Sequence, residues 1–161
     1  DVGSGNIGAT NVLRTGRKGI ALATLLLDAG KGAAAVLLAQ HFASYEAAQV
    51  AGVAAFAGHC FPVWLKFQGG KGVSTLLGVA FAAAPLIGVC VALVWLGAAA
   101  ITRYSSAGGL AAAVAAPVAG YFLGAPGWAD AFAVMAVLLW WRHADNIKRL
   151  LNGTESKIGA K

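Results

Sequence analysis

Apolar runs recur along almost the whole chain, separated only by short breaks that contain glycine, proline or charged residues. Of the 161 residues, 59% are hydrophobic and only 11% are charged. Too few polar side chains remain to cover a soluble globule of this size. A membrane-spanning helix needs about 20 mostly apolar residues to cross a hydrocarbon layer of roughly 30 Å. The sequence therefore predicts an all-α integral membrane protein, a polytopic helical bundle forming one domain over residues 1–161.

The breaks divide the chain into six expected helices. They lie near residues 20–40, 47–65, 72–87, 89–102, 107–123 and 129–142. The stretch from 72 to 102 is ambiguous, because Pro85 and Gly88 interrupt it. At about 1.5 Å per residue, neither half comfortably spans the membrane alone. Two short helices are our preferred interpretation, and a single long helix is the alternative.

Basic residues occupy every second connection between the expected helices. These residues are Arg14, Arg17, Lys18, Lys66, Lys71, Arg103, Arg142, Lys148, Arg149, Lys157 and Lys161. The alternate connections, around His41–Glu46, around Gly88 and over Gly124–Asp130, hold no Lys or Arg. This asymmetry is typical of the positive-inside rule, so the basic connections are expected to face the cytoplasm. Keeping Arg103 on that side requires two crossings after Lys71, which favours two helices over residues 72–102.

Four polar segments lie in the basic connections, and the first of them is rich in glycine. Glycines allow close backbone approach, while hydroxyl and amide side chains add hydrogen-bond donors, which suits a phosphate held at a helix start. The expected phosphate-binding residues are Ser4, Gly5, Asn6, Gly8, Thr10 and Asn11, with Arg14 adding a charge. A flexible turn is the alternative for this Gly-x-Gly-x-x-Gly spacing. No strand precedes it, so a dinucleotide-binding fold is not indicated.

The second segment places Lys71 between Gly70 and Gly72, just ahead of an apolar helix. This arrangement resembles a second anion site at a helix N-terminus. It is not a Walker loop, because position 65 is Leu and a glycine follows the lysine. Two separate basic, glycine-rich sites indicate a bisphosphate or two phosphorylated substrates.

The other two polar segments are Arg103–Ser106 and Arg142–Arg149. His143 and Asn146 are three residues apart, so we expect them on one helical face at the cytoplasmic mouth, with Arg149 next along it. A solvated positive-inside anchor is the alternative interpretation for Arg142, Lys148 and Arg149.

Three further polar residues lie in or beside apolar segments. Asp28 and Lys31 are three apart inside the first one, where isolated charges would cost several kcal/mol. A structural ion pair is favoured there over a catalytic role. His59 could act as a base, but a hydrogen-bonded structural role is favoured beside the Phe61–Pro62 turn.

Several classes of site are disfavoured by what the sequence lacks. It contains only six carboxylates, two of them in outward connections, so carboxylate-bound metal clusters are not expected.

A small membrane transporter of phosphorylated metabolites is the main alternative function. Its polar groups should continue across the bilayer midplane, whereas here they gather on one side. A membrane scaffold is a third possibility, but it leaves the basic glycine-rich loops unexplained.

Three of the segments together resemble the acyl-phosphate-dependent glycerol-3-phosphate acyltransferase family (PlsY). They are Ser4–Asn11, Gly58–Pro62 with Phe67–Gly72, and His143–Leu150 with Gly153 and Glu155. The resemblance covers essentially the entire chain, with the motifs in the right order. It implies seven helices with the N-terminus outside, and so predicts one further helix before Asp1.

The resemblance also implies an activity in bacterial phospholipid synthesis, at the inner membrane. A fatty acyl group moves from acyl phosphate to the 1-hydroxyl of glycerol-3-phosphate, giving 1-acyl-glycerol-3-phosphate and phosphate. We expect the donor's own phosphate to accept the hydroxyl proton, with His143 as the rival base. Membrane lipids surround the expected monomer, and no cofactor, metal or nucleic acid is implied.

The resemblance assigns roles to the polar residues of these segments. The catalytic residues it implies are Ser4, Arg14, Lys71, His143 and Asn146. The substrate-binding residues it implies are Gly5, Asn6, Gly8, Thr10, Asn11, Gly70, Gly72, Arg103 and Ser106.

Overall fold

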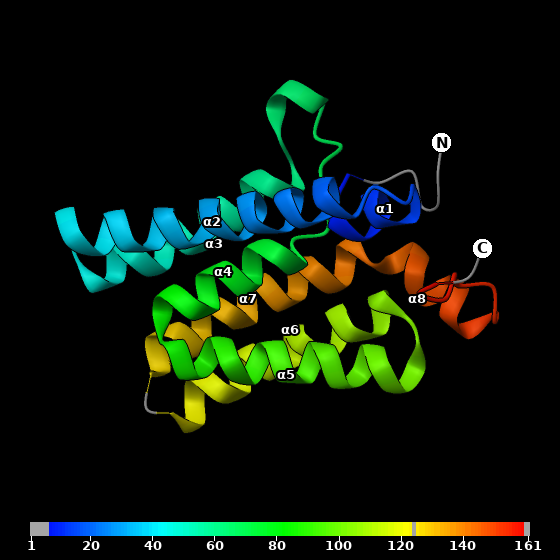
Figure 1. Ribbon diagram of the computed structural model, residues 1–161. Helices are drawn as coiled ribbons and strands as arrows, with labels where there is room; N and C mark the ends of the chain where they lie inside the picture. The colour runs from blue at the N-terminus through cyan, green and yellow to red at the C-terminus, as the bar shows by residue number, and fades with distance from the viewer. Residues whose placement is uncertain (1–6, 124, 160–161) are drawn as a thin grey trace.

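The computed structural model describes residues 7–123 and 125–159, and the regular elements in these ranges are all helices (Figure 1). The six longer helices are α2 (Lys18–Phe42), α3 (Tyr45–Cys60), α4 (Val73–Ala83), α5 (Pro85–Thr102), α6 (Ser105–Phe122) and α7 (Pro126–Arg142). Two short helices, α1 (Ala9–Arg14) and α8 (Ala144–Leu151), precede and follow them, and a 3₁₀ turn η1 covers Val63–Leu65. The expected all-α bundle is therefore confirmed, with α2–α7 corresponding to the six expected helices.

The stretch from 72 to 102 forms two helices, but the break is not at Gly88 as expected. It lies at Ala84, which is extended (φ −160°, ψ 128°). A residue before proline avoids the helical region, and Pro85 then begins α5 where its missing N–H costs nothing. Gly88 instead lies inside α5, where a Cβ would overlap the ring of Phe81.

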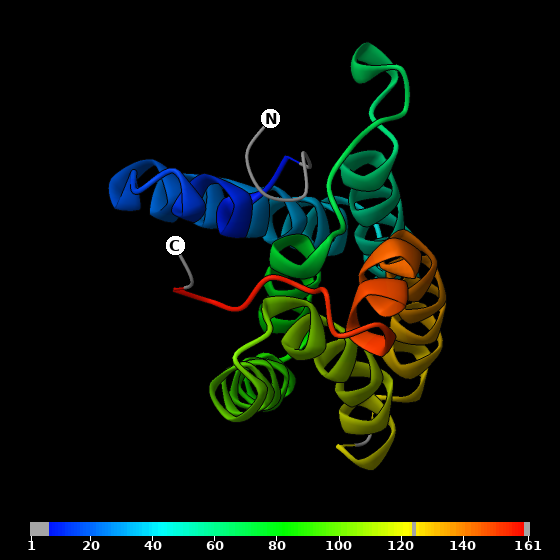
Figure 2. The same cartoon turned by 90° about the vertical axis from the view of Figure 1, so that its right-hand side faces the viewer.

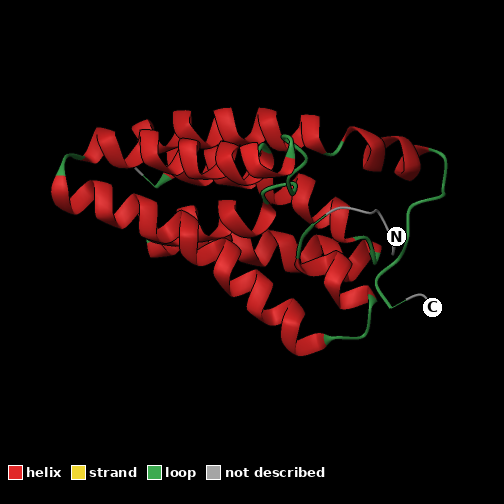
Figure 3. Cartoon of the chain, turned by 90° about the horizontal axis from the view of Figure 1, so that it is seen from above, coloured by secondary structure: helices red, strands yellow, loops and turns green. Residues whose placement is uncertain are grey.

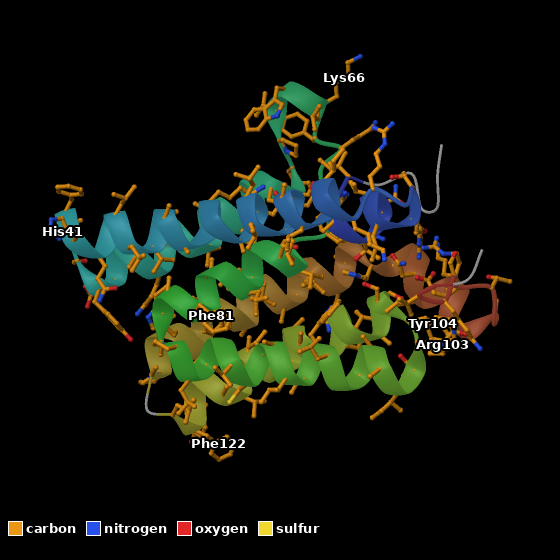
Figure 4. All side chains as sticks on the ribbon, in the orientation of Figure 1. His41, Lys66, Phe81, Arg103, Tyr104 and Phe122 are labelled. Carbon is orange, nitrogen blue, oxygen red and sulfur yellow. The ribbon has the colours of Figure 1, made fainter. Side chains whose placement is uncertain are left out.

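The connection between α3 and α4 also differs from expectation, because α3 ends at Cys60 rather than continuing to residue 65. Pro62 cannot continue the helix, and the chain leaves the bundle as a projecting loop with Lys66 near its tip (Figures 1 and 4). Two hydrogen bonds close the base of this loop. Gly69 N–H donates to the Cys60 carbonyl at 3.2 Å, and Gly70 N–H donates to the His59 carbonyl at 3.1 Å.

Helix α4 is the centre of the bundle and contacts α2, α3, α5, α6 and α7. Viewed from the end that carries α1 and α8, it lies among the other helices (Figure 2). Its Leu76, Val79 and Ala80 are fully buried, and they join the same core as Phe56 and Trp128. With 11 residues, α4 is only about 16 Å long. Gly72 and Thr75 at its N-terminal end are buried, so this end lies inside the bundle.

Four segments in the described ranges are long and apolar enough to cross a membrane. They are Lys18–Phe42, Tyr45–Leu65, Pro85–Thr102 and Ser105–Phe122. Their outward faces carry large exposed apolar side chains such as Leu27, Leu93 and Ile101. This distribution is typical of helices whose outer surface contacts lipid.

The two ends of the bundle differ in charge. The end with α1 and α8 also carries Arg103 and the C-terminal segment, whereas His41 lies at the opposite end (Figures 3 and 4). Ile158 N–H donates to the Arg103 carbonyl at 2.7 Å, so the C-terminal segment crosses this end and meets the α5–α6 connection. The basic connections are thus gathered at one end, as the sequence predicts.

Close backbone contact between α2 and α4 generates a prediction. A Cβ at Gly78 would overlap the Ala29 carbonyl, so Gly78→Ala should force the two helices apart and lower the thermal unfolding midpoint in detergent by several degrees. Gly30→Ala is the matched control, because a Cβ at Gly30 meets nothing within 4 Å. A Gly78→Ala protein as stable as the Gly30→Ala protein would contradict this packing.

Candidate functional site

A cavity of about 500 Å³ lies at the basic end of the bundle. One part of its wall is polar and includes Thr10, Arg14, Lys71, Ser106, His143 and Asn146. The other part is apolar and includes Leu22, Leu25, Leu77, Val91, Trp95 and Leu96. A pocket built this way fits a ligand with an anionic head and an alkyl tail.

The first glycine-rich segment lies partly outside the described residues, which exclude Ser4, Gly5 and Asn6. Its described part begins α1 and lines the cavity through Gly8, Thr10 and Asn11. Gly8 has φ 152°, a backbone conformation that favours glycine. The Thr10 hydroxyl is 3.1 Å from the Ser105 hydroxyl, so α1 is joined directly to the start of α6.

The Lys71 loop, defined here as Gly69–Gly72, leads into α4. Gly72 is the residue before α4 and has φ 86°, a left-handed conformation that favours glycine. A Cβ there would also overlap the ring of Phe56. This tight turn lets Lys71 and the first turn of α4 line the cavity.

Lys71 is a partly buried cation in a basic environment. Burial, assisted by the positive charge of Arg149, lowers the pKa of Lys71 to about 8, against the opposing effect of Glu155. Its ammonium group is still mostly protonated at neutral pH. An anionic ligand would add the partner that favours the charged form.

His143 and Asn146 both line the cavity, although they do not share one helix as the sequence analysis expected. The chain turns at His143, which is the junction between α7 and α8, and Asn146 lies one turn into α8. At this junction the His143 side chain folds back, and its Nδ1 donates to the Leu139 carbonyl at 2.8 Å. A carbonyl only accepts, so Nε2 carries no proton in the neutral ring and is available as an acceptor.

Burial is the main reason why the pKa of His143 is lowered to about 4, and the positive charge of Lys71 adds to the effect. The hydrogen bond to Leu139 opposes it. His143 is therefore neutral at physiological pH.

Glu155 is the residue that the sequence analysis quoted in a motif but did not place in the site. Its buried carboxylate accepts hydrogen bonds from Ser106 Oγ at 2.8 Å, Asn146 Nδ2 at 2.7 Å and Arg149 Nε at 2.6 Å. Burial raises its pKa, but these three bonds outweigh burial and leave the pKa lowered. A lone carboxylate in a basic C-terminal segment was the sequence signal that could have identified it.

Two expected binding residues do not line the cavity. Arg103 lies outside the cavity wall and holds the C-terminal segment, with Nη2 3.5 Å from the Ile158 carbonyl. Gly70 is also absent from the wall, although the adjacent Lys71 and Gly72 belong to it. Binding roles for Arg103 and Gly70 stay predictions.

The expected ion pair within α2 is present and extends to a third residue. Lys31 Nζ is 2.6 Å from Asp28 Oδ1 and 2.6 Å from His59 Nδ1. Asp28 and His59 also border the cavity. Within residues 7–123 and 125–159, no group of three or more His, Cys, Asp or Glu side chains could hold a metal ion.

Comparisons with known proteins agree on one family. A family model described as glycerol-3-phosphate acyltransferase matches residues 1–153. The glycerol-3-phosphate acyltransferase of Mesorhizobium japonicum is 59% identical over 160 residues, covering 99% of this chain and 82% of the relative. That of Agrobacterium fabrum is 57% identical over 160 residues, covering 99% and 78%.

Two solved structures are similar over nearly the whole chain. One is the glycerol 3-phosphate form of PlsY (YgiH), described as an integral membrane glycerol 3-phosphate acyltransferase. It has a TM-score of 0.94 and 38% identity, and the match covers 98% of this chain and 80% of that one. The lysophosphatidic acid form of the same protein has a TM-score of 0.92 and 37% identity, covering 97% and 81%.

The Glu155 contacts generate a prediction about stability. Glu155→Ala leaves two buried donors and one arginine without their acceptor, which should cost more than about 2 kcal/mol and lower the thermal unfolding midpoint in detergent. Asp145→Ala is the matched control, because that carboxylate is 83% exposed and, within the described residues, pairs only with Lys148. Equal midpoints for the two variants would show that Glu155 does not support the site.

Proposed function

The chain belongs to the glycerol-3-phosphate acyltransferase family, and we propose that its acyl donor is acyl phosphate. The acceptor is the 1-hydroxyl of glycerol-3-phosphate, and the products are 1-acyl-glycerol-3-phosphate (lysophosphatidate) and inorganic phosphate. The observation that carries the proposal is the cavity, whose lining combines basic and polar side chains with a group of apolar ones, here called the apolar arm. The forms in which the solved relative is described, with glycerol 3-phosphate and with lysophosphatidic acid, support the acceptor and the product.

The polar end suits the phosphate groups. Lys71 and Arg14 both line it, and their partial burial strengthens their interaction with an anion because less water competes than at an exposed site. Two phosphates must approach each other during the reaction, so these cations reduce their repulsion while orienting them. Ser106, His143 and Asn146 supply the neutral polar part of the same wall.

The apolar arm suits the fatty acyl chain. Leu22 and Leu25 of α2 contribute to it from one side, and Val91, Trp95 and Leu96 of α5 contribute from the other. An acyl chain lying there would point from the membrane interior toward the polar end. We place that end at the cytoplasmic face of the bacterial inner membrane, because the basic connections gather there.

The reaction balances without a nucleophile from the protein. The 1-hydroxyl oxygen attacks the acyl carbonyl carbon, and the bond from that carbon to the phosphate oxygen breaks. The departing phosphate takes up the hydroxyl proton. An acyl phosphate is a mixed anhydride with a good leaving group, so the protein contributes mainly alignment and charge stabilisation.

His143 is the rival proton acceptor, and its environment favours an orienting role instead. Its Nε2 is free to accept a hydrogen bond from the hydroxyl, because Nδ1 donates to Leu139. A pKa of about 4 makes it a weak base at neutral pH, where an efficient base has a pKa near the working pH. The donor phosphate is therefore the proposed acceptor of the proton.

The donor is tested by giving the intact purified protein glycerol-3-phosphate with either an acyl phosphate or an acyl thioester. Lysophosphatidate and inorganic phosphate should form in equal amounts with acyl phosphate, and neither should form with the thioester. Product from the thioester but not from acyl phosphate would overturn the donor assignment.

His143 variants test whether the donor phosphate or His143 accepts the hydroxyl proton. His143→Gln keeps an acceptor oxygen and should retain most activity, whereas His143→Ala should lower kcat/KM by about 10- to 100-fold through lost orientation. Binding of glycerol-3-phosphate is measured in parallel to verify an intact site. If both variants fall to the uncatalysed rate while binding is preserved, His143 is the base and the donor phosphate is not.

The ionisation of Lys71 should cause kcat/KM to fall at the alkaline side of its pH profile. The value of kcat/KM reports ionisations of the free enzyme, so it should fall as pH rises through about 8, where Lys71 loses its charge. Lys71→Arg stays charged in this range and should move the falling limb to higher pH. An unchanged limb in Lys71→Arg would show that another group titrates.

A further inference from the structure

The Lys71 loop is held on one side by an arginine that does not line the cavity. Arg142 Nη2 donates to the Gly69 carbonyl at 2.8 Å, and Arg142 Nε donates to the Gly70 carbonyl at 3.2 Å. Two parallel donors in a rigid fork fix both the position and the orientation of consecutive peptide groups. The guanidinium also lies over the ring of Phe61, with 5.4 Å from its central carbon to the ring centroid.

The opposite side of the loop rests on His59. The backbone N–H of Gly70 donates to the His59 carbonyl, and a Cβ on Gly70 would overlap His59 Nε2. Position 70 therefore needs glycine because an imidazole occupies the space of a side chain. Glycine here reflects a tertiary contact, whereas Gly72 has a left-handed backbone.

A fixed hydrogen-bond network sets the orientation of this imidazole. The Lys31 ammonium can only donate, so His59 Nδ1 accepts from it at 2.6 Å. The same ammonium is paired with Asp28 at 2.6 Å. His59 Nδ1 is also 3.4 Å from Asp28 Oδ1, and its Nε2 faces Gly70. Two residues of α2 thus determine how His59 of α3 supports the loop.

We propose that Arg142 and His59 are positioning residues that clamp the Lys71 loop and hold Lys71 at the spacing from His143 that phosphate binding requires. Arg142 is the residue immediately before His143, so the end of α7 fixes one wall of the cavity and grips the opposite loop. The sequence interpretation of Arg142 as a solvated positive-inside anchor does not account for its two bonds to the loop. This inference rests on the proposed function for the identity of the phosphorylated ligand.

Replacing Arg142 by lysine distinguishes a residue that holds the Lys71 loop from one that supplies only positive charge. A positive-inside anchor needs only charge, so Arg142→Lys would then behave as the native protein does. A clamp needs the planar fork, so Arg142→Lys and Arg142→Gln should both raise KM for glycerol-3-phosphate by about tenfold or more, with a smaller change in kcat. Lys148→Gln is the control, because Lys148 is exposed and its one ion pair in the described part of the chain is with Asp145.

A second pair of variants tests the His59 side and decides the question if Arg142→Lys does not fold. Gly70→Ala should displace the imidazole or the loop and raise the same KM. Gly58→Ala should leave KM unchanged, because a Cβ at Gly58 meets nothing within 4 Å. A native KM in Gly70→Ala, or in Arg142→Lys where that variant folds, would overturn the clamp.

Direct binding by calorimetry, with no acyl donor present, separates this proposal from the proposed function. Native protein that binds glycerol-3-phosphate or inorganic phosphate, with weakened binding in Arg142→Lys and Gly70→Ala, supports the clamp. Native-like binding in these variants refutes the clamp and leaves the proposed function intact. Binding of inorganic phosphate without binding of glycerol-3-phosphate would refute the proposed acceptor instead, and failure to bind either ligand would overturn both proposals.

Discussion

The close backbone contact between α2 and α4 is the interaction on which the rest of the structure depends. A Cβ at Gly32 would lie 2.8 Å from the Thr75 carbonyl, and one at Gly78 would overlap Ala29. Small residues let the two helices approach at van der Waals distance, which is how helices associate where lipid removes the hydrophobic driving force. Because α4 is short and held this way, its N-terminus and Lys71 lie inside the bundle, beside the apolar arm of the cavity. The basic and apolar parts of the site therefore meet.

Charge compensation shapes the basic end. Lys71 is partly buried near three arginines, and Glu155 is the carboxylate whose burial is offset by Ser106, Asn146 and Arg149. The family's phosphorylated substrate would supply the missing negative charge at the point where neutral His143 offers an acceptor. In the proposed mechanism this arrangement supplies alignment and electrostatic stabilisation, and no nucleophile comes from the protein.

Sequence reasoning recovered the features that depend on local chemistry. Apolar runs between glycine, proline and charged residues located α2–α7, the distribution of lysine and arginine indicated two helices between Lys71 and Arg103, and the spacing of Asp28 and Lys31 indicated their ion pair. The family resemblance is confirmed as well. Features that depend on packing between distant segments were missed. Gly88 is buried against Phe81 rather than in a turn, the chain bends at His143, and Glu155 joins α6 to α8. The contacts of Arg142 with Gly69 and Gly70 join positions more than seventy residues apart, which no local pattern records.

The central claim is that the protein aligns its substrates while the donor's phosphate takes the proton. The most direct measurement is a crystal structure of the intact protein with glycerol-3-phosphate and a non-transferable acyl phosphonate. The account predicts a phosphonate oxygen within about 3 Å of the 1-hydroxyl, with Lys71 on a phosphorylated group and the alkyl chain beside Leu25 and Leu96. A 1-hydroxyl hydrogen-bonded only to His143 Nε2, with the phosphonate turned away from it, would contradict the account.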